Sequence, residues 1–136
     1  MAITGRSNLL RLLGIVLAIG FLSCGACSPK PFINSISPNV ATAGSNQFLL
    51  TVNGMDFRRD SIVSWNGSLR VTTFVSVHQL VVAISAADIA APGTVLVFVF
   101  NPPGNNAISF SGAIGKSNVT VCSGKNSNAV SFTINP

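Results

Sequence analysis

The chain has 136 residues, carries 8 Lys and Arg against 3 acidic residues, and has a net charge of +5. This length predicts a single domain. Hydrophobic residues make up 48% of the chain and charged residues 8%, and there is one His, no Tyr and no acid besides three Asp. Few side chains are therefore available for acid/base catalysis or metal binding. The composition argues against an enzyme, against a metal site and against a cofactor.

The first 27 residues have the composition of a helical signal segment. Arg6 and Arg11 precede the run from Leu12 to Leu22, which holds eleven residues without a polar side chain. A basic start and a short apolar run are typical of a secretory signal, whereas a membrane-spanning helix needs about 20 apolar residues. We therefore expect residues 1–27 to be a signal peptide. The domain is expected over residues 28–136, whose six basic and three acidic residues give a charge of +3.

The end of this segment resembles a bacterial lipoprotein signal, in which a small residue precedes the cysteine that receives lipid. Ser23 before Cys24 and Ala26 before Cys27 both fit, so Cys24 and Cys27 are the lipidation candidates. The resemblance implies a protein exported to the bacterial periplasm, outer membrane or cell surface and held at the membrane by an N-terminal lipid. Secretion without lipid and a retained N-terminal anchor are the alternatives.

Cys24 and Cys27 also have the C-x-x-C spacing of redox sites and of half a zinc site. No βαβ pattern and no second pair of cysteines or histidines accompanies them, so we expect neither chemistry. Cys122 is the one cysteine well inside the domain, and we expect a buried or free thiol there. A disulfide with Cys27 is the alternative if cleavage falls at Cys24, because disulfides persist in exported proteins.

From Pro31 onward, short β-rich runs alternate with clusters of Gly, Pro, Asn and Ser, as in a β-sandwich or barrel. The predicted fold class is all-β, an immunoglobulin-like β-sandwich of about seven strands. The strands are expected at Phe32 to Ser37, Gln47 to Asn53, Ser61 to Trp65, Leu69 to Val75, Gln79 to Ser85, Thr94 to Asn101 and Ala129 to Ile134. The run from Ala86 to Ala91 is the one expected helical turn.

Particular residues predict turns and core. Asn66-Gly67 between two strands predicts a tight hairpin, because both residues accept positive φ. Gly54 predicts a turn that is closed to side chains. The large buried area that a small sandwich needs is expected from Phe57, Trp65 and Phe74.

The order and spacing of these stretches resemble the IPT/TIG domain family over essentially the whole chain after the leader. The resemblance is carried by Pro31 to Pro38, Ala43-Gly44-Ser45, Phe48-x-Leu50-x-Val52-x-Gly54-x-x-Phe57, Val63-x-Trp65-Asn66-Gly67, Gly93-Thr94, Val97-x-Val99-x-Asn101-Pro102 and Phe132-x-Ile134. It implies an immunoglobulin-like fold and a role in protein interaction or adhesion. An accessory role in carbohydrate binding is the alternative that the resemblance leaves open.

About 22 residues, from roughly 105 to 126, are extra to this pattern. We expect them to form an added strand pair or a protruding loop. The segment from Asn105 to Ser111 nearly repeats the segment from Ser127 to Thr133, so the two compete for the last strand position. We favour the second segment, because Phe132 and Ile134 sustain the alternation whereas the first copy breaks at Gly112.

The strand from Thr94 to Asn101 is apolar on both faces. If its valines face the core, then Leu96, Phe98 and Phe100 lie on the outer face, where a sandwich normally has polar residues. These three residues are therefore the candidate partner surface. A second subunit or another protein covers them in one hypothesis. In the other, the extra segment folds back with Ile108, Phe110 and Val121 as the covering residues.

The titratable residues are scattered. His78 is expected to be a solvated turn residue, and a small hydrolase that uses it with Asp56 or Asp60 is the rival hypothesis. Asp56, Asp60 and Asn53 could form a calcium site, but the arginines between the two acids favour local charge compensation. The basic residues are dispersed and the leader directs export, so we expect no nucleic-acid partner. The sequence thus predicts a non-catalytic binding or structural module.

Overall fold

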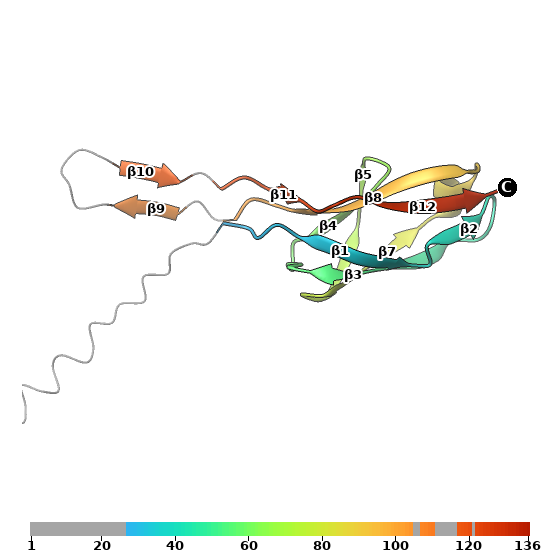
Figure 1. The fold of residues 1–136 in the computed structure, drawn as a ribbon, viewed down its shortest axis with the longest axis horizontal. Helices are drawn as coiled ribbons and strands as arrows, with labels where there is room; N and C mark the ends of the chain where they lie inside the picture. Colours follow the sequence, from blue (N-terminus) through green and yellow to red (C-terminus); the bar gives the residue numbers. More distant parts are fainter. Residues whose placement is uncertain (1–26, 105–106, 111–116, 121) are drawn as a thin grey trace, which may run out of the picture.

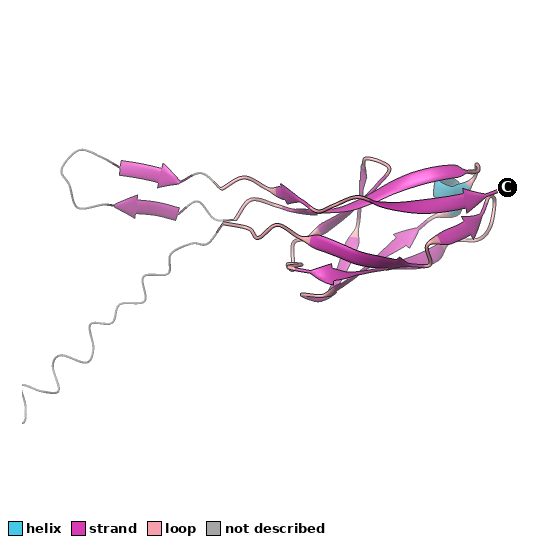
Figure 2. Cartoon of the chain, viewed as in Figure 1, coloured by secondary structure: helices cyan, strands magenta, loops and turns pink. Residues whose placement is uncertain are grey.

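The computed structural model describes residues 27–104, 107–110, 117–120 and 122–136. Of the signal segment expected over residues 1–27, residues 1–26 lie outside this part of the chain. Two β-sheets face each other (Figures 1 and 2), and the expectation of an all-β, immunoglobulin-like sandwich is confirmed. The first sheet has the order β1 (Phe32–Ser37), β3 (Phe48–Met55), β7 (Gln79–Ile84), β6 (Thr72–Ser76).

The second sheet has the order β2 (Val40–Thr42), β12 (Val130–Asn135), β8 (Gly93–Asn101), β4 (Ile62–Trp65), β5 (Ser68–Arg70), and the short β11 (Lys125–Asn126) also pairs with β8. All pairs in both sheets are antiparallel except β2 with β12, which is parallel. The expected helical turn is present as a 3₁₀ helix, η1 (Ala86–Ile89).

The core lies between the two sheets and is built from the alternate residues of each strand. In β8, Val95, Val97 and Val99 are buried, and the residues between them face outward. Phe132 of β12 is fully buried at the centre, with its ring 4.9 Å from that of Trp65 and 5.6 Å from that of Phe48. Of the expected aromatic core, Phe57 and Trp65 are buried, whereas Phe74 is only half-buried at the edge strand β6.

The predicted strand from Leu69 to Val75 is wrong as a single element. The chain leaves the second sheet after β5 and enters the first sheet with β6, and Val71 lies between them with 95% of its surface exposed. The Thr72 hydroxyl donates to the Arg70 carbonyl and accepts from the Val63 amide, which fixes the crossing. Simple alternation carries no signal for such a change of sheet.

Two glycine predictions have different outcomes. Asn66 and Gly67 both have positive φ in the turn between β4 and β5, so the predicted hairpin is confirmed. Gly54 lies inside β3 rather than in a turn. Its backbone is packed so tightly that a Cβ atom would stand 2.0 Å from the Phe32 carbonyl oxygen and 2.6 Å from the Phe57 ring. This close approach is the reason that glycine is needed there.

The described part of the extra segment contains a separate pair of strands. β9 (Ala107–Phe110) and β10 (Ser117–Thr120) pair with each other, and in Figure 1 they extend beyond the end of the sandwich, away from the C-terminus. The second of the two similar segments supplies the last strand, β12, in which Phe132 and Ile134 are buried. The final strand is therefore the one that the alternation favours.

Replacing Phe132 with Ala should lower the free energy of unfolding by about 3–5 kcal/mol, because it removes a fully buried ring and leaves a cavity beside the rings of Trp65 and Phe48. Urea denaturation of the purified protein measures this change. Ser131→Ala, at the neighbouring exposed position of β12, is the control and should change stability by less than about 0.5 kcal/mol. A loss below about 1 kcal/mol for Phe132→Ala would place this ring outside the core.

Candidate functional site

The outer face of β8 carries an apolar patch. Leu96 is 52% exposed, and Phe98 is half-buried beside it on the same face. The strand register continues this patch across the sheet, since Phe98 pairs with Ser64 of β4 and Ser64 pairs with Leu69 of β5. Leu69 is 58% exposed. We call Leu69, Leu96 and Phe98 the outer patch, and the outward direction expected for Leu96 and Phe98 agrees with their positions.

Phe100 differs from the other two residues of the predicted surface. Gly124 lies against its ring so closely that a Cβ on this glycine would be 2.4 Å from two ring carbons. The segment that leads into β11 therefore covers Phe100. The side chains of Ile108, Phe110 and Val121, which were expected to cover this face, lie outside the described part of the structure. The backbone of β9 pairs with β10 and not with the second sheet.

A buried amide joins three segments at the end of the sandwich near Phe100. The Asn101 side chain is fully buried, and its nitrogen donates to the carbonyls of Pro29 at 3.0 Å and Asp56 at 2.9 Å. Its oxygen accepts from the Ser61 hydroxyl at 2.5 Å. One side chain thus ties β8 to the N-terminal segment and to the loop between β3 and β4.

A disulfide between Cys27 and Cys122 closes the same end, with their Cα atoms 5.1 Å apart. The expectation of a free or buried thiol at Cys122 is therefore wrong, and the alternative pairing is the observed one. The Asn101 and Ser28 contacts explain the pairing, because they hold the residues after Cys27 against β8, beside the segment that contains Cys122. The two cysteines are 95 residues apart in the sequence, so local patterns could offer this pairing only as an alternative.

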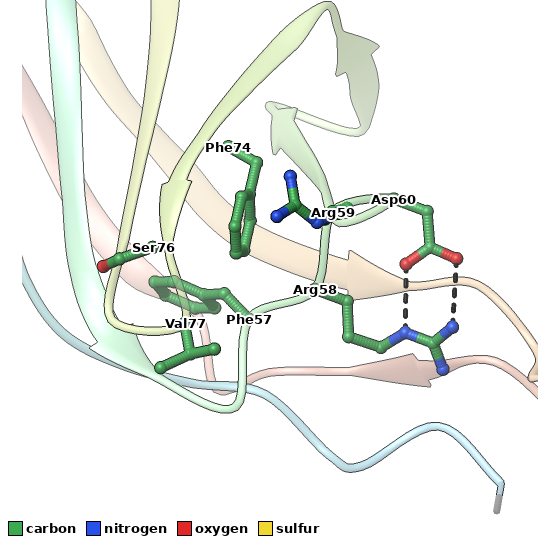
Figure 3. A pocket seen from close by; sticks show the side chains of 7 residues that line it. All are labelled: Phe57, Arg58, Arg59, Asp60, Phe74, Ser76 and Val77. Atoms are coloured by element: carbon green, nitrogen blue, oxygen red, sulfur yellow. Dashed lines mark hydrogen bonds and ion pairs between the residues drawn. The ribbon is translucent and has the colours of Figure 1, made fainter.

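A hollow of about 910 Å³ opens next to this end, between the loop from Phe57 to Asp60 and the turn from β6 to β7 (Figure 3). The Phe57 amide donates to the Val77 carbonyl at 3.0 Å, which holds the loop to the turn. Within the loop, the Arg58 amide donates to the Ser61 hydroxyl at 2.7 Å. The apolar lining comes from Phe57, Phe74 and Val77, and the polar lining from Arg58, Arg59, Asp60 and Ser76.

The charged residues at the hollow are arranged unequally. Arg58 donates from Nε to Asp60 at 3.0 Å and from Nη1 to the Ser28 hydroxyl at 2.6 Å, so its charge is balanced within the chain. Arg59 instead places its guanidinium 5.5 Å from the centre of the Phe74 ring. A second hollow of about 380 Å³ shares Arg59 and Asp60 and reaches Leu69 of the outer patch.

The residues of the rival hydrolase hypothesis do not meet in the described structure. His78 is exposed in the turn between β6 and β7, and the partner of its Nδ1 is the Gly54 carbonyl oxygen at 3.1 Å. Asp60 is paired with Arg58, and Asp56 is exposed at positive φ. Asp88, the remaining acid, accepts from the Ser85 amide at the start of η1 and pairs with Arg70.

Two residues of this region were not singled out for these roles by the sequence. Asn101 stands out only through the Asn-Pro pair at the end of an apolar strand. This pair indicates the end of a strand but not a buried side chain that hydrogen-bonds to several segments. Arg59 carries no local signal, because its surroundings come from a loop and a turn 17 positions apart, at Asp60 and Val77.

Within the described residues, no helix is long and apolar enough to cross a membrane.

Comparison with family models gives a match. The family model described as IPT/TIG domain matches residues 31–134, which is most of the chain and runs from β1 to all but the last residue of β12. No curated protein matches the chain in sequence.

Replacing Asn101 with Ala should lower the free energy of unfolding by about 2–3 kcal/mol, because the buried Ser61 hydroxyl and the carbonyls of Pro29 and Asp56 each lose a partner. Asn126→Ala, an exposed asparagine on β11, is the matched control and should be nearly neutral. Urea denaturation of both variants with the disulfide intact tests this expectation. Equal stability of the two variants would contradict a stabilising role of the Asn101 hydrogen bonds.

Proposed function

Because the chain belongs to the IPT/TIG domain family, whose members are immunoglobulin-like, non-enzymatic modules commonly used in protein interaction and adhesion, we propose that it is an exported module that binds another protein. The observation that carries this proposal is the outer patch. Two leucines more than half exposed flank Phe98 on a sheet face that usually carries polar residues. Burying an apolar side chain of this size contributes about 1.5–3 kcal/mol, so a partner gains by covering it.

The disulfide supports export. Disulfides persist in the periplasm, at the cell surface and in secreted proteins, and they are rare where thiols are kept reduced. A bond between Cys27 and Cys122 is consistent with the leader-like composition of the first residues, although it is an independent observation. Both point to a protein that works outside the cytoplasm.

The disulfide also bears on which cysteine carries a lipid. A lipid joined through the sulfur of a cysteine and a disulfide at the same sulfur exclude each other. Cys27 uses its sulfur for Cys122, which leaves Cys24 as the attachment point in our proposal. Cleavage before Cys24 also retains Cys27 in the mature chain, as the disulfide requires. Two or more acyl chains on Cys24 would give stable membrane anchoring.

The protein expressed with its leader in a bacterial host should be recovered from the membrane as a chain that begins at Cys24 and carries acyl chains. Intact-mass measurement decides this, and Cys24→Ser should abolish acylation. Cys27→Ser is the matched control and should remain acylated, although it loses the disulfide. Acylation that depends on Cys27, or an unprocessed chain starting at Met1 in the cytoplasm, would contradict the assignment.

Leu96→Ser should weaken partner capture from envelope extracts roughly tenfold, since one apolar anchor of about 1.5 kcal/mol is lost. Leu49→Ser is the control, because Leu49 is 64% exposed on the outer face of the opposite sheet. Quantitative mass spectrometry of the captured proteins compares the two variants, and thermal melting verifies that both are folded. Equal capture by both variants would contradict a role of the outer patch. Selective binding on a glycan array, without protein capture, would favour the carbohydrate-binding alternative.

A further inference from the structure

The hollow beside the loop from Phe57 to Asp60 has a positive charge without a balancing acid. The chain has three acidic residues, all of them described: Asp60 pairs with Arg58 and Asp88 pairs with Arg70. Asp56 makes no ion pair among the described residues. Arg59 likewise has no acidic partner in the described part of the chain, and it is exposed at the rim of the hollow. An anion bound there would meet a cation that is not already neutralised.

The orientation of Arg59 suits a carboxylate. Its guanidinium stands over the Phe74 ring at 5.5 Å, and Figure 3 shows it on the side of the rim away from the Arg58 and Asp60 pair. A guanidinium held against an aromatic face keeps the N–H groups at its edge available, and two of them match the two oxygens of a carboxylate. The contact with Phe74 already restricts the conformations of the Arg59 side chain, so this side chain loses less conformational entropy when a ligand binds.

The lining below this cation is apolar and firmly placed. Phe57 is 2% exposed, and Phe74 and Val77 present larger parts of their surface to the hollow. The hydrogen bond between the Phe57 amide and the Val77 carbonyl joins the loop to the turn from β6 to β7. A preformed apolar surface with a few charged groups at its rim is the usual plan of a small binding site, and among the charged residues here Arg59 is the one without an ion-pair partner in the described part of the chain.

We propose that this hollow binds a carboxylate carried on an apolar peptide segment, with the carboxylate at Arg59 and an apolar side chain against Phe57, Phe74 and Val77. A peptide fits better than an acidic sugar, because Ser76 is the one uncharged polar side chain among the described residues that line the hollow. The hydroxyl groups of a sugar would find few partners there. Among the described residues that line this hollow, none is Leu69, Leu96 or Phe98, so the inference stands apart from the proposed role of the outer patch.

The carboxylate has two sources, a peptide C-terminus or an acidic side chain, and three probes distinguish them. The first is an acetylated leucine-phenylalanine dipeptide with a free C-terminal carboxylate, and the second is the same dipeptide amidated. The third is the amidated peptide extended by one aspartate. Each is titrated into the mature, disulfide-bonded protein, and NMR follows the amides of Phe57 and Val77 and the Nε–H of Arg59.

We expect a carboxylate-bearing peptide to bind about tenfold more tightly than the amidated dipeptide, as a charge-assisted pair of hydrogen bonds implies. Arg59→Gln should remove this preference, and its exposed position makes loss of folding no concern. Lys30→Gln, which removes an exposed cation that does not line the hollow, is the matched control and should retain it. The proposal is overturned if the amidated dipeptide binds equally well, if none of the peptides binds, or if Arg59→Gln keeps the preference. Tighter binding of glucuronate than of either carboxylate peptide would also overturn it, in favour of an acidic sugar.

Discussion

The end of the sandwich that carries the disulfide and adjoins the hollow depends on the hydrogen bonds of the Asn101 side chain. A buried amide without partners is costly, so the chain segments that satisfy it must stay where they are. Those segments are the start of the domain at Pro29 and the loop that begins at Asp56. The first brings Cys27 beside Cys122, and the second carries Arg58 and Arg59 to the hollow.

The fold could be predicted largely from local patterns. Strands β1, β3, β7, β8 and β12 coincide with the predicted runs to within a residue or two at each end, because alternation reports burial on one face. The pattern fails at Val71, where β5 and β6 belong to different sheets although the sequence through them is continuous and β-rich. Which sheet a strand joins is decided by pairing partners far away in the sequence, and alternation does not contain that information.

The candidate sites also differ in how far local sequence patterns predict them. The outward position of Leu96 follows from the burial of its neighbours in β8, so the outer patch was within reach of sequence reasoning. The covering of Phe100 by Gly124 was not, because it depends on where the chain returns after the extra hairpin. The hollow could not be predicted from the sequence either. Its lining joins a loop to a turn, and Gly54 allows Phe57 to pack close to the backbone of β3 in a way that only the assembled fold reveals.

The Cys27–Cys122 bond has a mechanical consequence. Traction applied to the chain ahead of Cys27 divides at this residue. One path follows the backbone into β1 of the first sheet, and the other crosses the sulfurs and reaches β11 and β8 of the second sheet. Along β1 the pull runs parallel to the strand, so its hydrogen bonds with β3 are strained together rather than opened one after another. The Asn128 amide, bonded to both backbone groups of Ile33, adds a further brace between the layers. Tension at this end is therefore borne by both sheets at once.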